Sequence, residues 1–509
     1  MPNNGADIDA KAIGNLILIL TRLQANGGIS GDNHPIRSAL GADGLDDHAA
    51  RLSALRDLKA SRNTQLLILK ATEDEICRLR KETSAVTLQR GIQSLPDDLI
   101  RAIFEAGFTS YGCDGSGFDP VNVTHVDRRF RTIALETPRI WTRLSNVSTI
   151  DQLEHQIERS KAAALTISVM AFLDEGEYPC TISEFLKITT PLSSRWQYFE
   201  YVVRAPDTAA EGNFGYTCQA LLDYPNLDLP RLTSFLWQKY YYDESQDNLD
   251  LRTFFEDWKM PNLTDFEGLN ALVNATLIGP NLVFVTLEFD TVEPSSWDLG
   301  DTLATLASSP RLKYLCLKIG QIDSEAAEQA EFPPTHLANL VSLKHKLSGD
   351  TNSPFSLKLF SALTVPALTN MSIVLDTYIP IVDPMFRDLF EGILSIASHY
   401  PKLQTFSVDC TSSPDPPLGN VVATLGKSLP SLQEVTLTGR GLCVHRRWLS
   451  VPISWHLLRL RGFDRESYGM VCKMATRRRW GSCKLDILDE RNVSAEMVHI
   501  LGDKLVYQT

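Results

Sequence analysis

The stretch PNLVFVTL at residues 280–287 recurs, with substitutions, between residues 230 and 437. All copies share Pro-x-Leu, then an apolar residue three positions after the leucine and usually another two positions later. A spacing of two between apolar residues is that of a strand buried on one face. The other copies are PRLTSFLW (230–237), PNLTDFEG (261–268), PRLKYLCL (310–317), PALTNMSI (366–373), PKLQTFSV (401–408) and PSLQEVTL (430–437). Each copy therefore predicts a short, half-buried strand.

The distances between these prolines indicate a structural repeat. Four of the six steps are 31, 30, 35 and 29 residues long. The step of 56 residues after Pro310 is about twice that length, which predicts one degenerate unit around Leu340 to Leu347. The step of 19 residues after Pro261 predicts a shortened unit.

Amphipathic helices precede several copies, and together with the turn and strand they resemble one unit of a leucine-rich-repeat solenoid. Their apolar residues are Leu299, Leu303 and Leu306, then Phe386, Leu389, Phe390, Ile393 and Ala397, then Val422, Leu425 and Leu429. Weaker candidate strands lie at 165–169, 196–203, 457–460 and 484–488. A last helix from Ser494, its N-cap, to Leu505 would close the array. We therefore predict a leucine-rich-repeat-like α/β solenoid with a C-terminal cap over residues 150–509.

The N-terminal region predicts helices of a different kind. Residues 1–44 read as a flexible N-terminal arm with a short apolar run and a glycine-rich end. Residues 45–90 contain no proline and predict one long amphipathic helix, broken near Asn63. In a heptad register its core positions would include Lys59, Arg62, Glu73 and Arg80, so a helix docked along one stripe is favoured over a coiled coil.

Residues 91–145 form a short apolar segment with a recognisable pattern. It reads SLPDDLIRAIF at 94–104 and VTHVDRRFRTIALETPRIW at 123–141, with a loop rich in Gly and Asp between them. A unit this small with so many large apolar residues must share some of them with a neighbour or a partner. The segment resembles the F-box family, through its Leu-Pro opening, its Ile-Phe pair, its Val-x-Arg-x-Phe and Ile-Ala elements and its final Trp.

The resemblance implies a three-helix F-box that docks on a Skp-type adaptor and through it joins a cullin. The residues it assigns to adaptor binding are Leu95, Pro96, Leu99, Ile103, Phe104, Val126, Phe130, Ile133 and Trp141. Three features depart from the family pattern: Asp98 replaces the usual Glu, Asp127 replaces a small Cys or Ser, and the loop 109–120 is long. Asp127 introduces a charge that would weaken docking on the adaptor.

Composition and motifs argue against several other classes. The chain has 49 Lys and Arg against 62 Asp and Glu, a net charge of −13, which is the wrong sign for a general nucleic-acid binder or for a basic membrane-surface protein. Its nine cysteines show no C-x-x-C pair, and its ten histidines show no metal-ligand spacing. Gly426-Lys427-Ser428 lacks the earlier glycine of a phosphate-binding loop. We expect no enzyme activity, no cofactor, no metal and no membrane segment, and a cytoplasmic or nuclear location.

One basic segment stands out from the acidic chain. Residues 440–480 hold ten basic and two acidic residues, a local charge of +8. Arg477, Arg478 and Arg479 are candidates for docking an acidic partner. The alternative is a basic surface that only balances the acidic remainder of the chain.

The fold class that follows is α+β, with N-terminal helices, a three-helix F-box and a leucine-rich-repeat solenoid. The function it predicts is that of a substrate-recognition subunit of an SCF-type (cullin–RING) ubiquitin ligase, whose F-box binds the adaptor and whose repeats bind an unknown protein substrate. The alternative is a leucine-rich-repeat interaction scaffold without a ubiquitin role.

Overall fold

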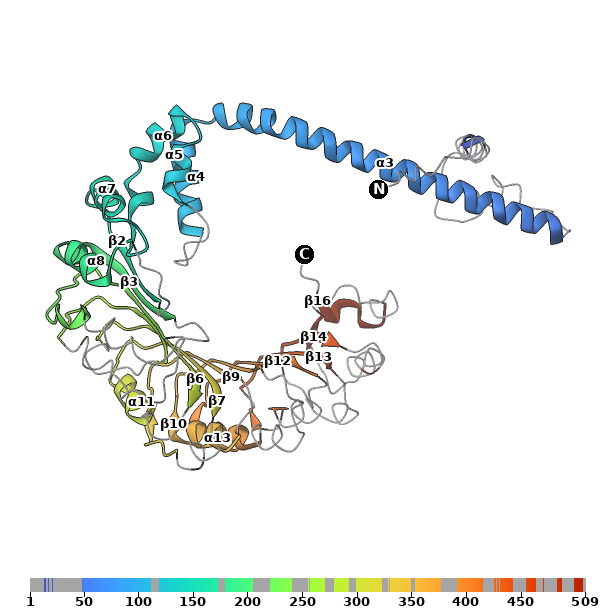
Figure 1. Ribbon diagram of the computed structural model, residues 1–509. Helices are drawn as coiled ribbons and strands as arrows, with labels where there is room; N and C mark the ends of the chain where they lie inside the picture. The colour runs from blue at the N-terminus through green and yellow to red at the C-terminus, as the bar shows by residue number, and fades with distance from the viewer. Residues whose placement is uncertain are drawn as a thin grey trace. The chain divides into compact units, whose positions relative to one another are not determined.

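Figure 1 shows a computed structural model of the 509-residue chain. The structure describes residues 48–110, 119–172, 179–204, 220–239, 257–270, 279–292, 299–322, 330–348, 353–376, 391–414, 431–442, 455–463, 483–487 and 499–506, with residues 13, 14, 17, 21, 255, 328, 425, 426, 428, 429 and 470. The chain divides into two compact units, Met1–Ile103 and Phe104–Thr509. Apart from four helical residues, the predicted arm 1–44 lies outside the described residues.

Helix α3 (His48–Gln93) dominates the first unit. It begins near the predicted start but runs through Asn63 without a break, because neither glycine nor proline interrupts it there. Arg78 supports the helix with ion pairs to Glu75 and Glu82, both at 2.6 Å. The residues of the predicted apolar stripe are not covered by any residue that the structure describes: Leu52, Leu55, Leu66, Leu69, Ile76 and Leu79 are all exposed.

Short helices follow in the region predicted as a three-helix motif. They are α4 (Asp97–Ser110), α5 (Pro120–Thr124), α6 (Arg128–Leu135) and the 3₁₀ helix η1 (Pro138–Trp141). Aspartates cap the two middle helices: Asp119 Oδ1 accepts from Val121 N at 2.9 Å, and Asp127 Oδ1 accepts from Phe130 N at 2.7 Å. These caps fix where α5 and α6 begin.

Among the described residues of the second unit, fourteen strands form one open, parallel sheet and follow one another across it in chain order. The strands are β1 (Arg143–Ser145), β2 (Leu165–Phe172), β3 (Trp196–Arg204), β4 (Ser234–Lys239), β5 (Asp265–Leu269), β6 (Phe284–Val292), β7 (Tyr314–Ile322), β9 (Ser342–Ser348), β11 (Asn370–Asp376), β12 (Thr405–Pro414), β13 (Glu434–Leu442), β14 (Leu457–Phe463), β15 (Lys484–Ile487) and β16 (Leu505–Val506). Strands β8 (Thr335–His336) and β10 (Leu363–Thr364) do not belong to this sheet and pair with each other. An α+β chain with a long parallel sheet is therefore confirmed.

Each Pro-x-Leu copy sets the start of one strand. In all seven copies the strand begins four residues after the position of the proline. The predicted degenerate unit is confirmed as β9, where Ala338 stands in the proline's place and Leu340 is fully buried. The leucine of every copy is at most 3% exposed: Leu232, Leu263, Leu282, Leu312, Leu368, Leu403 and Leu432. Burial of this leucine gives each unit a share of one continuous core.

Helices cover one side of the sheet along the second unit (Figure 1). They are α7 (Ile150–Ser160), α8 (Ile182–Thr189) with the 3₁₀ helix η2 (Thr190–Arg195), α11 (Leu299–Ala307), α13 (Ser353–Ala362) and the 3₁₀ helix η3 (Ala397–His399). Leu299, Leu303 and Leu306 of α11 are buried, as predicted, in the same core cluster as the strand residues. The side chains of the strands that point away from these helices lie on the opposite face, which we call the open face of the sheet.

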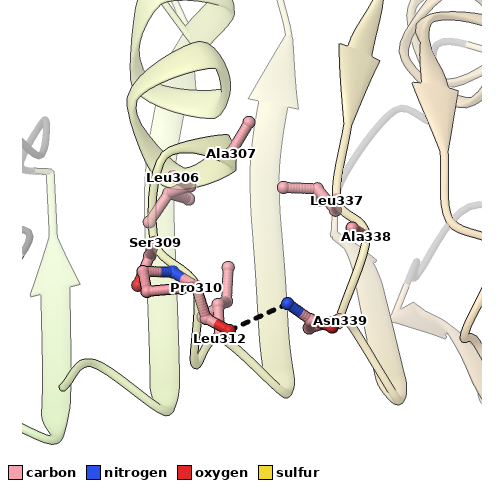
Figure 2. A pocket seen from close by; sticks show the side chains of 8 residues that line it. All are labelled: Leu306, Ala307, Ser309, Pro310, Leu312, Leu337, Ala338 and Asn339. Atoms are coloured by element: carbon pink, nitrogen blue, oxygen red, sulfur yellow. Dashed lines mark hydrogen bonds between the residues drawn. The ribbon is translucent and has the colours of Figure 1, made fainter. Parts of the chain in front are cut away.

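A ladder of asparagines joins successive turns. The middle residue of Pro-x-Leu donates its side-chain amide to the proline carbonyl of the unit before: Asn262 to Pro230 at 2.7 Å and Asn281 to Pro261 at 2.8 Å. Asn339 does the same to Pro310 at 2.8 Å, the dashed bond in Figure 2. The hollow drawn there is lined mainly by apolar residues of this repeat, so it reads as a seam between units and not as a ligand site.

The C-terminal end differs from the prediction. Residues 499–501 are helical, the 3₁₀ helix η7 covers Gly502–Lys504, and Leu505 then enters strand β16, which pairs with β15. The predicted helix to Leu505 is therefore wrong at its end, while its N-cap Ser494 lies outside the described residues. The edge of the sheet at β15 has unpaired backbone groups that a further strand can bind, and the spacing of apolar residues does not reveal this pairing.

No helix within the described part of the chain is long and apolar enough to span a membrane.

Candidate protein-interaction surfaces

Helix α4 has two apolar faces with opposite surroundings. Ile100, Phe104 and Phe108, spaced four apart, are 1%, 4% and 8% exposed. Leu99 and Ile103, each one position earlier, are 52% and 55% exposed. Residues four apart lie on one side of a helix, so Leu99 and Ile103 form one open apolar strip. Pro96, before the helix, is also exposed, and Leu95 is half-buried.

Small and charged residues flank this strip. Ala102 and Ala106 are exposed beside it, which leaves room for another backbone to approach. Asp97 and Asp98 lie in the first turn of α4, where a negative charge interacts favourably with the helix dipole. Arg101 forms an ion pair with Asp98 at 2.9 Å. Apolar side chains rimmed by polar ones are typical of a protein interface.

Three of the residues assigned to adaptor binding lie in the interior. Phe104, Ile133 and Trp141 are at most 4% exposed. The Phe104 ring packs edge-on against the half-buried Phe130 at 5.3 Å between centroids. Val126, by contrast, is 62% exposed. The predicted set therefore separates into surface residues that can contact a partner and buried residues that hold the segment together.

Trp141 ties the helical segment to the start of the sheet. Its Nε1 donates to the Ala134 carbonyl at 2.8 Å, and the Arg159 guanidinium of α7 lies 4.5 Å from its ring centroid. On the other side, Arg143 of β1 donates to the Phe108 carbonyl at 3.0 Å and lies over the Phe108 ring. Cation–π contacts of this kind stabilise by about 0.5–2 kcal/mol. The segment from Phe104 is therefore packed as part of the second unit.

Asp127, the departure that the sequence marks as unfavourable, has a structural role. Its carboxylate caps α6 through Phe130 N, as described above. Asp is among the best N-cap residues, so its charge is used locally by the helix it begins. The side chain remains at an exposed position.

The open face of the sheet carries a second surface, which sequence reasoning missed. Phe284 and Tyr314 lie side by side on β6 and β7, stacked at 4.3 Å between centroids with an interplanar angle of 5°. They are 44% and 38% exposed. The equivalent position of β9 and of the other Pro-x-Leu copies holds a small, polar or acidic residue: Ser234, Asp265, Ser342, Asn370, Thr405 and Glu434. Further along the same column the half-buried Tyr198 of β3 and Leu457 of β14 are the other large apolar side chains. The available signal in the sequence was that two successive Pro-x-Leu copies have an aromatic residue at a position that is polar in the other copies.

Charges of both signs surround this aromatic pair. In the next row across the sheet, exposed Glu267 on β5 pairs with Thr286 of β6, and exposed Lys344 on β9 pairs with Cys316 of β7. One row further, Lys318 pairs with Glu288 at 2.6 Å. Burial raises the pKa of the Cys316 thiol, so this cysteine is protonated and suited to packing, not to nucleophilic chemistry.

The basic segment 440–480 is described only in part. Arg477, Arg478 and Arg479 lie outside the described residues. Arg459, which is described, lies on β14 between two acidic neighbours, with bonds to Glu434 at 3.0 Å and Asp486 at 3.3 Å. Its charge is therefore balanced within the sheet.

Among the residues that the structure describes, no group of three or more His, Cys, Asp or Glu side chains is arranged to hold a metal ion. No protein-family model matches the sequence, and a search of curated proteins gives no match. The assignment of function therefore rests on the two surfaces.

Proposed function

We propose that this chain is the substrate-recognition subunit of an SCF-type ubiquitin ligase. In this proposal residues 91–145 act as an F-box that docks on a Skp-type adaptor and through it on a cullin. The parallel repeats act as a leucine-rich-repeat solenoid that binds a protein substrate. The chain is not a catalyst, and ubiquitin transfer takes place on other subunits.

The observation that carries the proposal is the open apolar strip of α4. Leu99 and Ile103 occupy F-box positions, and about half of each side chain is exposed. Burying such residues against a partner gains roughly 25 cal/mol for each Å² of apolar surface removed from water. The buried residues Phe104, Ile133 and Trp141 then act indirectly, because they hold the segment that presents the strip.

The open sheet face is the proposed surface for the substrate. Exposed aromatic side chains are enriched at the centres of protein interfaces, and Phe284 and Tyr314 form an exposed, stacked pair of this kind. Glu267 and Lys344 lie on nearby strands and supply charges of both signs for orienting a bound segment.

The location that follows is the cytoplasm or nucleus, where the proposed adaptor and cullin work. Cysteines left free at Cys180, Cys316, Cys410 and Cys483 agree with a reducing compartment.

Capture of a Skp-type adaptor by the purified full chain tests the proposal. We expect the wild-type chain to bind the adaptor, and the variant Leu99→Asp with Ile103→Asp to lose at least on the order of 100-fold in affinity, because charges would be buried against an apolar partner. A control is Leu222→Asp, which places one negative charge on another exposed leucine, outside residues 91–145. Equal melting temperatures of all three proteins would show that folding is unaffected.

Failure of the wild-type chain to bind any Skp-type adaptor would overturn the ubiquitin-ligase assignment. The chain would then be a repeat scaffold, and its open sheet face would remain the candidate binding surface. Adaptor binding that survives both aspartates would place the docking surface elsewhere.

A further inference from the structure

Helix α3 exposes apolar residues at heptad spacing. Leu66 and Leu69 are 51% and 55% exposed, and Ile76, a further seven residues along, is 43% exposed. With Leu66 at heptad position a, Leu69 and Ile76 both fall at position d. Two heptads earlier, Leu52 and Leu55 also fall at a and d and are also exposed. Positions a and d form the seam through which two helices pair.

One residue on the side of α3 away from this seam is buried. Thr64, at position f, is 4% exposed. Position f points away from the a and d positions, so the burial of Thr64 leaves the seam open. Arg78 and its partners Glu75 and Glu82 occupy positions f and c, where they stabilise the helix without using the seam.

Charged residues occupy four further seam positions, with Arg80 at position a among them, and those near the centre of the seam select an orientation. Lys59 lies at a, Arg62 at d and Glu73 at a, and all three are exposed. In a parallel pair each seam residue meets its own copy, so Arg62 would face Arg62 and Glu73 would face Glu73. Like charges in a seam cost several kcal/mol, which excludes the parallel arrangement.

An antiparallel pair places an a residue opposite a d residue. When Leu66 of one copy faces Leu69 of a second copy, Arg62 faces Glu73 of that copy, and the two-fold axis repeats both layers. Lys59 then faces Ile76 of the second copy, and Leu55 faces Arg80; in both layers the long stem of the basic side chain can cover apolar surface while its charged end stays in water. Moving one copy by a heptad in one direction places Arg62 opposite Leu66, and in the other places Glu73 opposite Leu69, so either shift loses the charge match.

We propose that α3 binds a second copy of this chain as an antiparallel pair of helices, with its register fixed by Arg62 and Glu73. The occupant is a second copy because the centre of the exposed seam is complementary to itself: Leu66 meets Leu69 and Arg62 meets Glu73, each twice. A seam with charged layers is less stable than an all-apolar one, so the association depends on protein concentration.

Sedimentation of the full chain over a range of concentrations tests this proposal. We expect the wild-type chain to be dimeric at high concentration. Arg62→Glu alone, or Glu73→Arg alone, creates two like-charged layers and raises the dissociation constant on the order of 100-fold or more. The double variant restores both layers, and so does mixing the two single variants, because each then supplies the charge that the other lacks.

The matched control is Asp74→Arg, which makes the same kind of charge change one residue away, at the outward position b. It should dimerise like the wild-type chain. Circular dichroism checks that every variant keeps its helix content. A wild-type chain that stays monomeric at all concentrations overturns the proposal, as does a double variant that fails to recover dimerisation while the single variants remain folded.

Discussion

The buried face of the sheet and the open strip of α4 consist of the same kinds of side chain but differ in what surrounds them. Leu263 and Leu282 are fully buried because the units before and after them in the array complete their packing. Leu99 and Ile103 lie on a helix whose other apolar side is already buried, and they stay about half exposed. Apolar residues in this chain thus hold the fold together in one place and are available for binding in another.

The largest expected effect is the loss of stability when a buried leucine of the sheet is shortened. Leu282→Ala removes a fully buried side chain and should lower the free energy of unfolding by about 2–5 kcal/mol, because it leaves a cavity between repeat units. Leu99→Ala, the matched change on α4, should lower it by less than about 0.5 kcal/mol. Urea denaturation of both variants provides the measurement. Equal losses would show that the α4 strip is part of the core.

A second expected effect is that the stability of the sheet core depends on pH. His345 of β9 lies between Leu317 and Ile373, and burial lowers its pKa to about 4. Its ordinary pKa is near 6.5, so the unfolded chain binds this proton more readily than the folded chain. Stability should therefore fall as the pH drops from about 6.5 to 4, by on the order of 3 kcal/mol from this residue alone.

The variant His345→Leu should remove that part of the pH dependence. His456→Leu, which changes an exposed histidine on the adjoining turn of β14, serves as the control and should leave the dependence in place. Thermal melting between pH 4 and 7 compares the three proteins. An unchanged slope in His345→Leu would mean that the histidine is not buried in its neutral form.

The smallest expected effect concerns Asp127. Asp127→Ala removes the N-cap of α6 and should destabilise by about 1 kcal/mol, whereas Asp127→Ser keeps a capping oxygen and should cost less. Neither change removes the α4 strip, so adaptor affinity should stay within about threefold of wild type. Denaturation and adaptor titration check the two halves of this prediction. Tighter adaptor binding by Asp127→Ser would instead support the view that its charge opposes docking.

The repeat strands could be predicted from the sequence because Pro-x-Leu marks both a turn and a buried residue. The very short strands β1 and β16 could not, since two or three residues show no period and depend on pairing with a neighbour. The cap at Asp127 was predictable in principle, because Asp directly before a helix is a common N-cap. Because the F-box resemblance presented Asp127 only as an unfavourable charge, its role as a helix cap was not considered.

The binding surfaces were predicted only in part. The F-box resemblance identified Leu99 and Ile103 together with Phe104 and Trp141, but a family pattern does not separate exposed from buried members. That separation depends on how α4 is rotated, which the packing of Ile100 and Phe108 determines. The Phe284–Tyr314 stack depends on the register between β6 and β7, and residues 30 positions apart in sequence become neighbours only when that register is known.

The most direct test of the account uses neighbouring residues of α4, Leu99 at 52% exposure and Ile100 at 1%. Leu99→Asp should keep the melting temperature within about 2 °C of wild type and abolish binding of a Skp-type adaptor, because it alters only the open strip. Ile100→Asp should lower the melting temperature by several degrees, because it buries an unpaired charge. Adaptor titration combined with thermal melting of the two variants gives both quantities. An unfolded Leu99→Asp variant, or a folded one that still binds the adaptor, would contradict the central claim that the exposed apolar strip of α4 is a docking surface.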